Sequence, residues 1–466
     1  MMVFGFLLFL SLFALIGISS VLHSRGTKKD YYLASSSIPP SLVGLSAVAT
    51  NNSGYMFIGV IGYTYVTGLA SIWLMIGWIL GDMTAATMVH RRLRAATERT
   101  GEVSYAGVLS AWNGSRNVAL QRIAGVVTLI FLLAYAGAQL VAGSKALHVL
   151  FGWPEWAGAV IGAVLVAVYC FSGGIRASIW TDAAQSVVMI LAMGLLLFVA
   201  TTSVGGVSGA IQQMGQVEGF LDWFPKGLIL PGLLGGLLFA VSWGFAGLSV
   251  AGQPHVMVRF MTLDCKTKMM RAKFWYYLWF IVFYAAATAV GMLSRIYLSD
   301  TGTFAELALP MMAQELLPPF LVGLILAGVF AATMSTADSV VLSCSSAVTH
   351  DLLPQNIEKT WILKVTTVLI TVFALGWALL NKQSVFSLVI MAWSGLASAF
   401  APLLIYLCFG GKPGHKTAVF SMLSGLAVAL LWRWAGWHNM IYEGMPGILS
   451  GLLILLVSSR LLPQKT

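Results

Sequence analysis

Apolar stretches long enough to cross a membrane recur along the whole chain, and they constrain the fold more than any other feature. The hydrocarbon core of a bilayer is about 30 Å thick, and a helix of about 20 apolar residues crosses it. We predict thirteen such helices, near residues 2–22, 41–68, 70–90, 122–149, 155–171, 179–204, 229–260, 273–298, 318–348, 361–380, 385–410, 416–435 and 442–462. The sequence therefore predicts an all-α polytopic membrane protein surrounded by a lipid bilayer.

The composition excludes several other classes of protein. Of the 466 residues, 59% are hydrophobic and 9% are charged, whereas soluble domains carry roughly 25% charged residues. A soluble enzyme, a secreted disulfide scaffold and a disordered protein are therefore excluded. The four cysteines form no CxxC pair and lie in or beside apolar segments, so we interpret them as unpaired packing residues. The chain has no GxxxxGK(S/T) loop for ATP, so an ion gradient or the solute gradient must supply the energy.

The formal net charge of +10 does not indicate a nucleic-acid partner, because the basic residues follow the positive-inside rule. They gather after odd-numbered spans, as in segments 91–99 and 266–273, and are few after even-numbered spans. This alternation predicts a multi-pass plasma membrane protein with its N-terminus outside and its C-terminus in the cytoplasm. Segment 2–22 lacks the basic start and the cleavage site of a signal peptide, so we predict a membrane span there.

Two of the predicted spans contain residues that a simple membrane anchor avoids. Segment 41–68 carries Asn51-Asn52-Ser53-Gly54, and segment 229–260 carries Gly252-Gln253-Pro254. Irregular backbone at membrane depth survives only where it lines a cavity or is buried in protein. The two segments are five spans apart and so have opposite orientations, as in transporters whose inverted repeats each begin with a broken helix. We expect one transporter domain over 1–466, with repeats at 41–204 and 229–410, an extra helix at 2–22 and C-terminal helices at 416–462.

Small and hydroxyl side chains form a stripe on one face of segment 318–348. Ser335, Thr336 and Ser339 lie three, four and seven positions after Ala332, so all four share one helix face, and Asp338 is beside them. A carboxylate within a span indicates a functional site, and hard cations such as Na⁺ prefer oxygen ligands. The alternative is a stripe that only packs helices together. Asp182 is a second acidic candidate, although the positive end of its helix would also favour a carboxylate there.

Other polar residues in the predicted spans can be explained without a bound ligand. We expect Asp82 to be solvated near the cytoplasmic end of its span, and Arg259 to extend its side chain toward water. Tyr135 and Gln139 either face a cavity or are satisfied interior polar groups.

Three stretches of small, polar and charged residues lie in order along the chain. The first is Ser172-Gly173-Gly174-Ile175-Arg176 with Trp180-Thr181-Asp182-Ala183-Ala184-Gln185. The second is Gly252-Gln253-Pro254-His255 with Val258-Arg259-Phe260-Met261. The third is Ala332-Thr333-Met334-Ser335-Thr336 with Ser343-Cys344-Ser345-Ser346-Ala347. Together the three stretches resemble the sodium:solute symporter family, and within it the bacterial sodium/proline symporter group, which implies a location in the bacterial inner membrane.

The resemblance implies a LeuT-type fold of two inverted five-helix repeats and two cation sites. The shared Na⁺ site would use the backbone carbonyls of Ala49, Asn52 and Ala332 and the hydroxyls of Ser335 and Thr336. A second Na⁺ site, found in some members, would use Asp182, Asp338 and Ser339. The substrate-binding candidates line the two broken spans and the fourth span: Asn51, Ser53, Gly54, Tyr55, Tyr135, Gln139, Trp243, Ala246 and Gln253.

The chain departs from the proline group at two positions. First, Asn51 stands where that group has an aspartate. Second, that group has a tryptophan seven residues before the glutamine that matches Gln253, whereas this chain has Ala246 there and its tryptophan, Trp243, lies ten residues before Gln253. The resemblance therefore implies Na⁺-coupled symport of a small organic solute, with proline or a related amino acid or carboxylate as the leading candidate, by a monomer that is not an enzyme. The alternatives are a proton-coupled carrier that uses Asp182 or Asp338, and a solute sensor, for which no output domain follows segment 442–462.

Overall fold

The computed structural model describes residues 1–228, 230–298, 305–353, 357–380 and 384–461, which form helices and turns and a single isolated β-bridge between Ile38 and Leu263. Eleven helical segments there are long and apolar enough to span a membrane. One of them, Pro40–Thr100, runs through two spans, and the shorter helix α19 (Gly444–Leu461) is a further apolar helix. This agrees with the thirteen predicted spans; the predicted boundaries at 229 and 462 lie outside the described residues.

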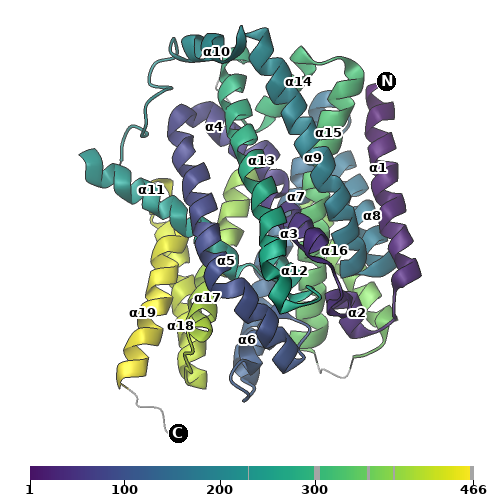
Figure 1. Cartoon of the computed structure of the whole chain (residues 1–466), viewed down its shortest axis with the longest axis vertical. Helices are drawn as coiled ribbons and strands as arrows, with labels where there is room; N and C mark the ends of the chain where they lie inside the picture. The colour runs from purple at the N-terminus through teal and green to yellow at the C-terminus, as the bar shows by residue number, and fades with distance from the viewer. Residues whose placement is uncertain (229, 299–304, 354–356, 381–383, 462–466) are drawn as a thin grey trace.

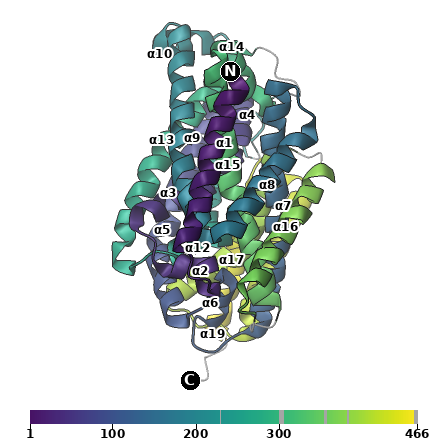
Figure 2. The same cartoon turned by 90° about the vertical axis from the view of Figure 1, so that its right-hand side faces the viewer.

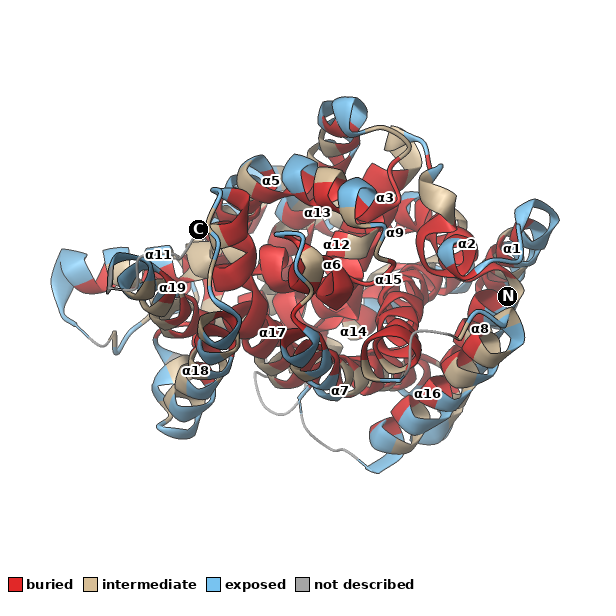
Figure 3. Cartoon of the chain, turned by 90° about the horizontal axis from the view of Figure 1, so that it is seen from below, coloured by how far each residue is buried: buried red, intermediate tan, exposed pale blue. Residues whose placement is uncertain are grey.

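Nine helices that carry or border most of the candidate site surround the centre of the bundle. They are α3 (Pro40–Gly54), α4 (Ile61–Thr67), α5 (Ile72–Thr100), α7 (Val118–Phe151), α9 (Ile175–Ser203), α12 (Pro254–Met261), α13 (Met269–Tyr297), α15 (Pro319–Ser346) and α17 (Val385–Cys408). Seen from below, buried residues fill this centre (Figure 3). In the most apolar window of α17, 94% of the residues are buried inside the protein.

The remaining spans form the rim, where exposed apolar side chains face the membrane. They are α1 (Met2–Ser19), α8 (Glu155–Gly173), α11 (Gly232–Leu248), α16 (Thr360–Leu380), α18 (His415–Trp434) and α19. Only 28% of the most apolar window of α1 or of α18 is buried, because lipid rather than protein covers one side of each helix. Figure 1 shows α1 beginning at the top of the molecule and α19 ending near the bottom, at opposite ends of the bundle.

Short helices close both ends of the bundle. In Figures 1 and 2, α2 (Lys28–Leu33) and α6 (Tyr105–Ala111) lie at the bottom, and α10 (Gly206–Met214) and α14 (Ala308–Leu316) lie at the top. The α8–α9 turn holds α2 in place. Gly174 has φ +56°, and a Cβ there would lie 2.4 Å from the carbonyl oxygen of Tyr31. Arg176, two residues on, forms a 2.7 Å ion pair with Asp30 of α2.

Both spans that the sequence predicts to be broken are interrupted at mid-length. α3 contains a non-helical Ser53 (φ 38°, ψ 179°) and continues through a π-helical turn, Tyr55–Val60, into α4. α11 ends at Leu248, a 3-10 turn covers Ser249–Gly252, and α12 begins at Pro254. Proline has no N–H to donate, so it begins α12 without losing a helical hydrogen bond.

Candidate functional site

The break in α3 turns its backbone toward two neighbouring helices. The N–H of Gly54 donates to Gln139 Oε1 of α7 at 2.9 Å instead of completing a helical turn with the carbonyl of Thr50. That carbonyl accepts a hydrogen bond from Thr336 Oγ1 of α15 at 2.9 Å. The strained backbone at Ser53 is therefore held by α7 and α15 together, as expected of a strained segment at a functional site.

Only glycine fits where these three helices meet. A Cβ on Gly54 would lie 2.5 Å from Thr333 Cγ2 and 2.9 Å from Gln139 Oε1. The backbone of α3 therefore approaches α15 and α7 as closely as the geometry allows.

Oxygen atoms from α3 and α15 converge at the predicted shared cation site. Ser335 Oγ lies 3.2 Å from the carbonyl oxygen of Ala49 and 3.0 Å from that of Ala332. The hydroxyl of Thr336 donates to the next carbonyl of α3, that of Thr50, and the side chain of Asn52 donates to the carbonyl of Val48 at 2.8 Å. All five residues predicted for this site are buried. Neutral carbonyl and hydroxyl oxygens at this spacing form a donor set that fits a hard monovalent cation.

The second predicted site brings together Asp182, Asp338 and Ser339, and it also contains a residue that the sequence analysis placed elsewhere. Arg259 is fully buried between the two carboxylates, so the expectation that its side chain reaches toward water is wrong. Its Nη2 lies 3.3 Å from Asp182 and 3.7 Å from Asp338. It also donates to the hydroxyls of Ser178 and Ser339.

This cluster holds two carboxylates against one guanidinium. One oxygen of each carboxylate, Asp182 Oδ1 and Asp338 Oδ2, has no hydrogen-bond partner among the residues that the structure describes. A buried, uncompensated negative charge is costly, so the cluster favours one more positive charge, either a bound cation or a proton.

Two hydroxyls that connect the second site to the broken helix were missed from the sequence. Ser46 Oγ donates to Asp182 at 2.6 Å, and Thr50 Oγ1 lies 3.0 Å from Ser339 Oγ. Ser46 and Thr50 are four residues apart and share a face of α3 with Val43, Ala47 and Gly54. This i, i+4 pair is the signal that would have indicated them.

Asn51, one of the two positions at which we expect the chain to depart from the proline group, contacts a carboxylate from another helix. Its amide donates to Asp82 Oδ2 of α5 at 3.1 Å and to the hydroxyl of Tyr276. Tyr276 and Tyr277 of α13 donate to the same carboxylate at 2.8 Å and 2.7 Å. Asp82 is fully buried, so the expectation that it is solvated is wrong.

The substrate-binding candidates of α7 and of the second broken span line one continuous region. Tyr135 Oη contacts Ser53 Oγ at 3.3 Å, and its ring lies 5.4 Å from the ring of His255. His255 in turn contacts the ring of Trp393 in α17, whose carbonyl oxygen accepts from Gln253 at 2.8 Å. His255 and Trp393 were not among the predicted site residues.

Several buried polar atoms in this region have no hydrogen-bond partner in the described part of the chain. They are Gln139 Nε2, Gln253 Oε1 and both ring nitrogens of His255. Buried polar atoms are almost always paired, so a group of unpaired ones indicates a place for a polar ligand. Donors and acceptors are both present, and none of these side chains carries a permanent charge.

The other candidates lie around this region at different depths. The carbonyl of Ala246 accepts from Trp393 Nε1 at 2.9 Å, so Ala246 lies against the same tryptophan. Tyr55 stacks on Phe386, with ring centroids 5.4 Å apart. Trp243 lies apart from the polar group, in a separate pocket of about 200 Å³ that it shares with Phe386 and Glu443.

Ion pairs tie the bundle together at both ends. At the end that carries α6, Glu102 accepts from His350 at 2.6 Å and pairs with Arg116 at 3.2 Å. At the other end, Glu306 pairs with Lys145 of α7 at 2.5 Å. Burial alone would raise the pKa of both glutamates, but these partners hold both pKa values below the ordinary range, so both carboxyls are ionised at neutral pH.

Comparison with known proteins places this architecture in a family. The profile of the Sodium:solute symporter family matches residues 31–425. The sodium/proline symporter of Escherichia coli (strain K12) is 29% identical over 456 residues, covering 94% of this chain and 89% of that protein. The sodium/proline symporter of Staphylococcus aureus (strain JH9) is 30% identical over 475 residues, covering 96% and 90%.

A solved structure of a Na⁺-coupled sialic acid symporter in a substrate-bound outward-open state has the same fold. It superposes with a TM-score of 0.80 and 18% identity, covering 99% of this chain and 98% of that one. The chain belongs to the sodium:solute symporter family: it is a multi-pass, sodium-coupled membrane transporter of the LeuT-type fold and not an enzyme.

Proposed function

We propose that this protein imports a small zwitterionic solute, with proline or a related amino acid as the leading candidate, together with Na⁺ by alternating access. The observation that carries the proposal is the oxygen set of Ala49, Ala332 and Ser335, where the broken helix α3 meets α15. We place the N-terminus outside, the C-terminus in the cytoplasm, the two repeats at 41–204 and 229–410, and the transport function in the monomer.

Sodium acts as a bridge between two helices in this mechanism. The carbonyls of α3 and the hydroxyls of α15 hydrogen-bond one another directly, and Na⁺ would replace these hydroxyl protons as the common partner of the oxygens. Binding Na⁺ fixes the break at Ser53, and the break in turn fixes the position of Gln139 through Gly54. Each ligand therefore favours the conformation that the other binds, and a tenfold mutual effect requires about 1.4 kcal/mol of coupling.

The polar region beside the break fits a molecule with a carboxylate and an amino group. Gln139 Nε2 offers a hydrogen-bond donor to a carboxylate, and Gln253 Oε1 offers an acceptor to an ammonium group. The rings of Tyr135, His255 and Trp393 supply apolar walls. The two relatives compared above are named as proline symporters, which supports the same class of solute.

The Ser335→Ala/Thr336→Ala variant tests the cation site. It removes two hydroxyl ligands, so we expect Na⁺-driven proline uptake into proteoliposomes to fall to background while the protein is still inserted and monodisperse. Ser346→Ala is the matched control, because Ser346 Oγ bonds within α15 to the carbonyl of Ser343. Uptake by the double variant with unchanged Na⁺ dependence would overturn the assignment. If proline is not the solute, thermal stabilisation across amino acids with and without Na⁺ identifies the solute first.

The buried cluster of Asp182, Asp338 and Arg259 favours proton coupling as a second candidate function. Two carboxylates face one guanidinium there, and a proton would balance the remaining charge as well as Na⁺ would. Uptake driven by a Na⁺ gradient alone, with pH clamped on both sides, separates the two mechanisms. Proton coupling predicts no concentrative uptake under those conditions and predicts uptake under a pH gradient without Na⁺.

A further inference from the structure

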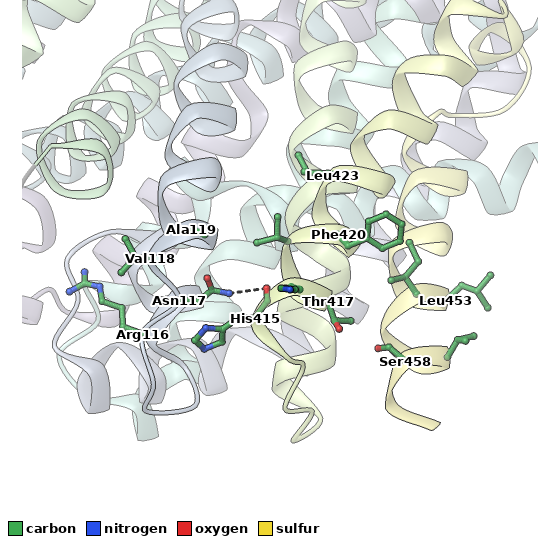
Figure 4. A pocket seen from close by; sticks show the side chains of 14 residues that line it. Arg116, Asn117, Val118, Ala119, His415, Thr417, Phe420, Leu423, Leu453 and Ser458 are labelled. Carbon is green, nitrogen blue, oxygen red and sulfur yellow. Dashed lines mark hydrogen bonds between the residues drawn. The ribbon is translucent and has the colours of Figure 1, made fainter. Parts of the chain in front are cut away.

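A large groove lies outside the transport pathway, on the side of the bundle where α7, α18 and α19 meet. Its volume is about 1280 Å³, several times that of the pocket around Trp243. Figure 4 shows side chains from these three helices lining it, with His415 and Arg116 toward its lower end and Leu423 toward its upper end.

The upper part of the groove is apolar. Its walls come from neighbouring faces of α18 and α19, and the side chains of Phe420 and Leu453 are 61% and 62% exposed. All three helices are membrane spans or extend into one, so this wall faces hydrocarbon rather than water. An acyl chain is the occupant that such a wall fits.

The lower end of the groove is basic and polar. Arg116, His415 and Lys416 line it, and no described lining residue is an Asp or Glu. Arg460 is exposed in the last turn of α19, three residues after Val457 of the lining and so on the same face of the helix. Arg116 already pairs with Glu102, so Lys416 and Arg460 contribute most of the available positive charge.

The backbone adds hydrogen-bond donors at the same place. α18 begins at His415, and the first N–H groups of a helix have no partner within the helix and carry a partial positive charge. The side chain of Asn117 donates to the carbonyl oxygen of His415 at 3.1 Å (Figure 4), which holds the start of α18 against α7. A basic side chain and a helix start that point to one place form a site for a phosphate group.

We propose that this groove binds one anionic phospholipid, with the phosphate at Lys416, Arg460 and the start of α18, and an acyl chain along Phe420 and Leu453. Basic pockets between membrane helices on the cytoplasmic side bind anionic head groups in this way. The lipid would join α18 and α19 to α7, which carries Tyr135 and Gln139 of the transport site.

Native mass spectrometry of the purified protein in detergent tests the proposal. The probes are phosphatidylglycerol and phosphatidylcholine with identical acyl chains, added at equal concentrations. We expect phosphatidylglycerol to be retained at least fivefold better by the unchanged protein. We expect Lys416→Gln/Arg460→Gln to lose that preference, whereas Arg271→Gln, an exposed basic residue on α13 at the far side of the bundle, retains it.

A second variant tests the apolar wall and guards against misfolding of the first. Leu423→Trp fills the groove without changing its charge, so we expect it to lower retention of both lipids. Inorganic phosphate alone should not shift the thermal midpoint, because it cannot fill the apolar wall. Equal retention of both lipids by the unchanged protein overturns the proposal. The proposal is also overturned if Arg271→Gln loses the preference for phosphatidylglycerol as fully as Lys416→Gln/Arg460→Gln does, or if Leu423→Trp retains both lipids as well as the unchanged protein.

Discussion

At the scale of single residues, the pairing of Asn51 with Asp82 explains how the chain accommodates an amide beside the break of α3. The carboxylate of Asp82 comes from α5 and accepts from Asn51 and from two tyrosines of α13. The acidic group thus lies one side chain farther from the break, on a neighbouring helix, and an amide at position 51 can donate to it.

A charge exchange between the two positions tests this explanation. Asp82→Asn removes the negative charge and replaces one of the two acceptor oxygens with an NH2 donor, and Asn51→Asp places two carboxylates in contact, so we expect each to reduce uptake at least tenfold. Asn51→Asp/Asp82→Asn restores one acid and one amide in contact, and we expect it to recover a substantial part of the uptake. Initial rates at saturating Na⁺ measure this. If the fold-loss of uptake in the double variant equals the product of the fold-losses in the two single variants, the two side chains act independently.

The close approach at Gly54 leads to a second prediction at this scale. In Gly54→Ala the new methyl group lies 2.5 Å from Thr333 Cγ2, so α3 and α15 must separate and the cation oxygens with them. We expect loss of uptake with normal insertion, together with a weaker stabilisation by Na⁺ in thermal unfolding. Thr333→Ser deletes Cγ2 and keeps the hydroxyl that donates to Phe330, so Gly54→Ala/Thr333→Ser should recover part of both. If neither uptake nor the stabilisation by Na⁺ recovers, the close contact with Gln139, and not the one with Thr333, accounts for the loss.

At the scale of elements, the sequence predicts the spans and both breaks but not the burial of their ends. Span length and the Asn-Asn-Ser-Gly and Gly-Gln-Pro stretches are local features, so they can be read without knowledge of neighbours. Asp82 and Arg259 lie near the ends of apolar segments, where water is the default expectation. Which helix covers them is a tertiary property: the tyrosines of α13 cover Asp82, and the carboxylates of α9 and α15 cover Arg259.

The link between the η7 turn (Ala305–Leu307) and the start of α17 gives a prediction for one element. Glu306 accepts from Ser384 Oγ at 2.7 Å and from the N–H of Phe386 at 3.1 Å. A hydrogen bond to a charged group contributes about 1.5–3 kcal/mol. We expect Glu306→Gln to speed hydrogen exchange in the first turn of α17 about tenfold, and Glu315→Gln, an exposed change on α14, to leave it unchanged.

The pH dependence of this link follows from the lowered pKa of Glu306. A carboxyl whose folded pKa lies below its unfolded value stabilises the fold fully above the unfolded value, about 4.3, and loses that contribution as pH falls through the folded pKa. We therefore expect the exchange rate of the first turn of α17, corrected for intrinsic chemistry, to stay constant from pH 6 to 8. A change in that range would contradict an ionised Glu306.

At the scale of the whole molecule, ion pairs and hydrogen bonds at both ends hold the helices together around the site. Besides the pairs of Glu102, Tyr105 Oη of α6 donates to the carbonyl of Ala251 at 2.6 Å, and Asp351 accepts from Gln121 at 2.8 Å. These bonds join α6 to the break of the second broken span, and the start of α7 to the turn that follows α15. Alternating access requires one set of ties to break while the other holds, so each set biases the conformational equilibrium.

The Glu102→Gln variant tests whether the ties around α6 control access from that side. The amide weakens the pairs with His350 and Arg116, so the conformation open toward the cytoplasm gains population and the outward-facing one loses it. Apparent affinity falls in proportion to the population that is competent to bind. We expect the half-saturating external Na⁺ concentration to rise about three- to tenfold, with little change in the maximal rate.

Glu98→Gln is the control for Glu102→Gln. Glu98 lies one turn before Glu102, near the end of α5, and its side chain is 57% exposed in its pair with Lys266. An equal shift in both variants would point to a general surface-charge effect, and no shift in Glu102→Gln would exclude these ties from the conformational equilibrium.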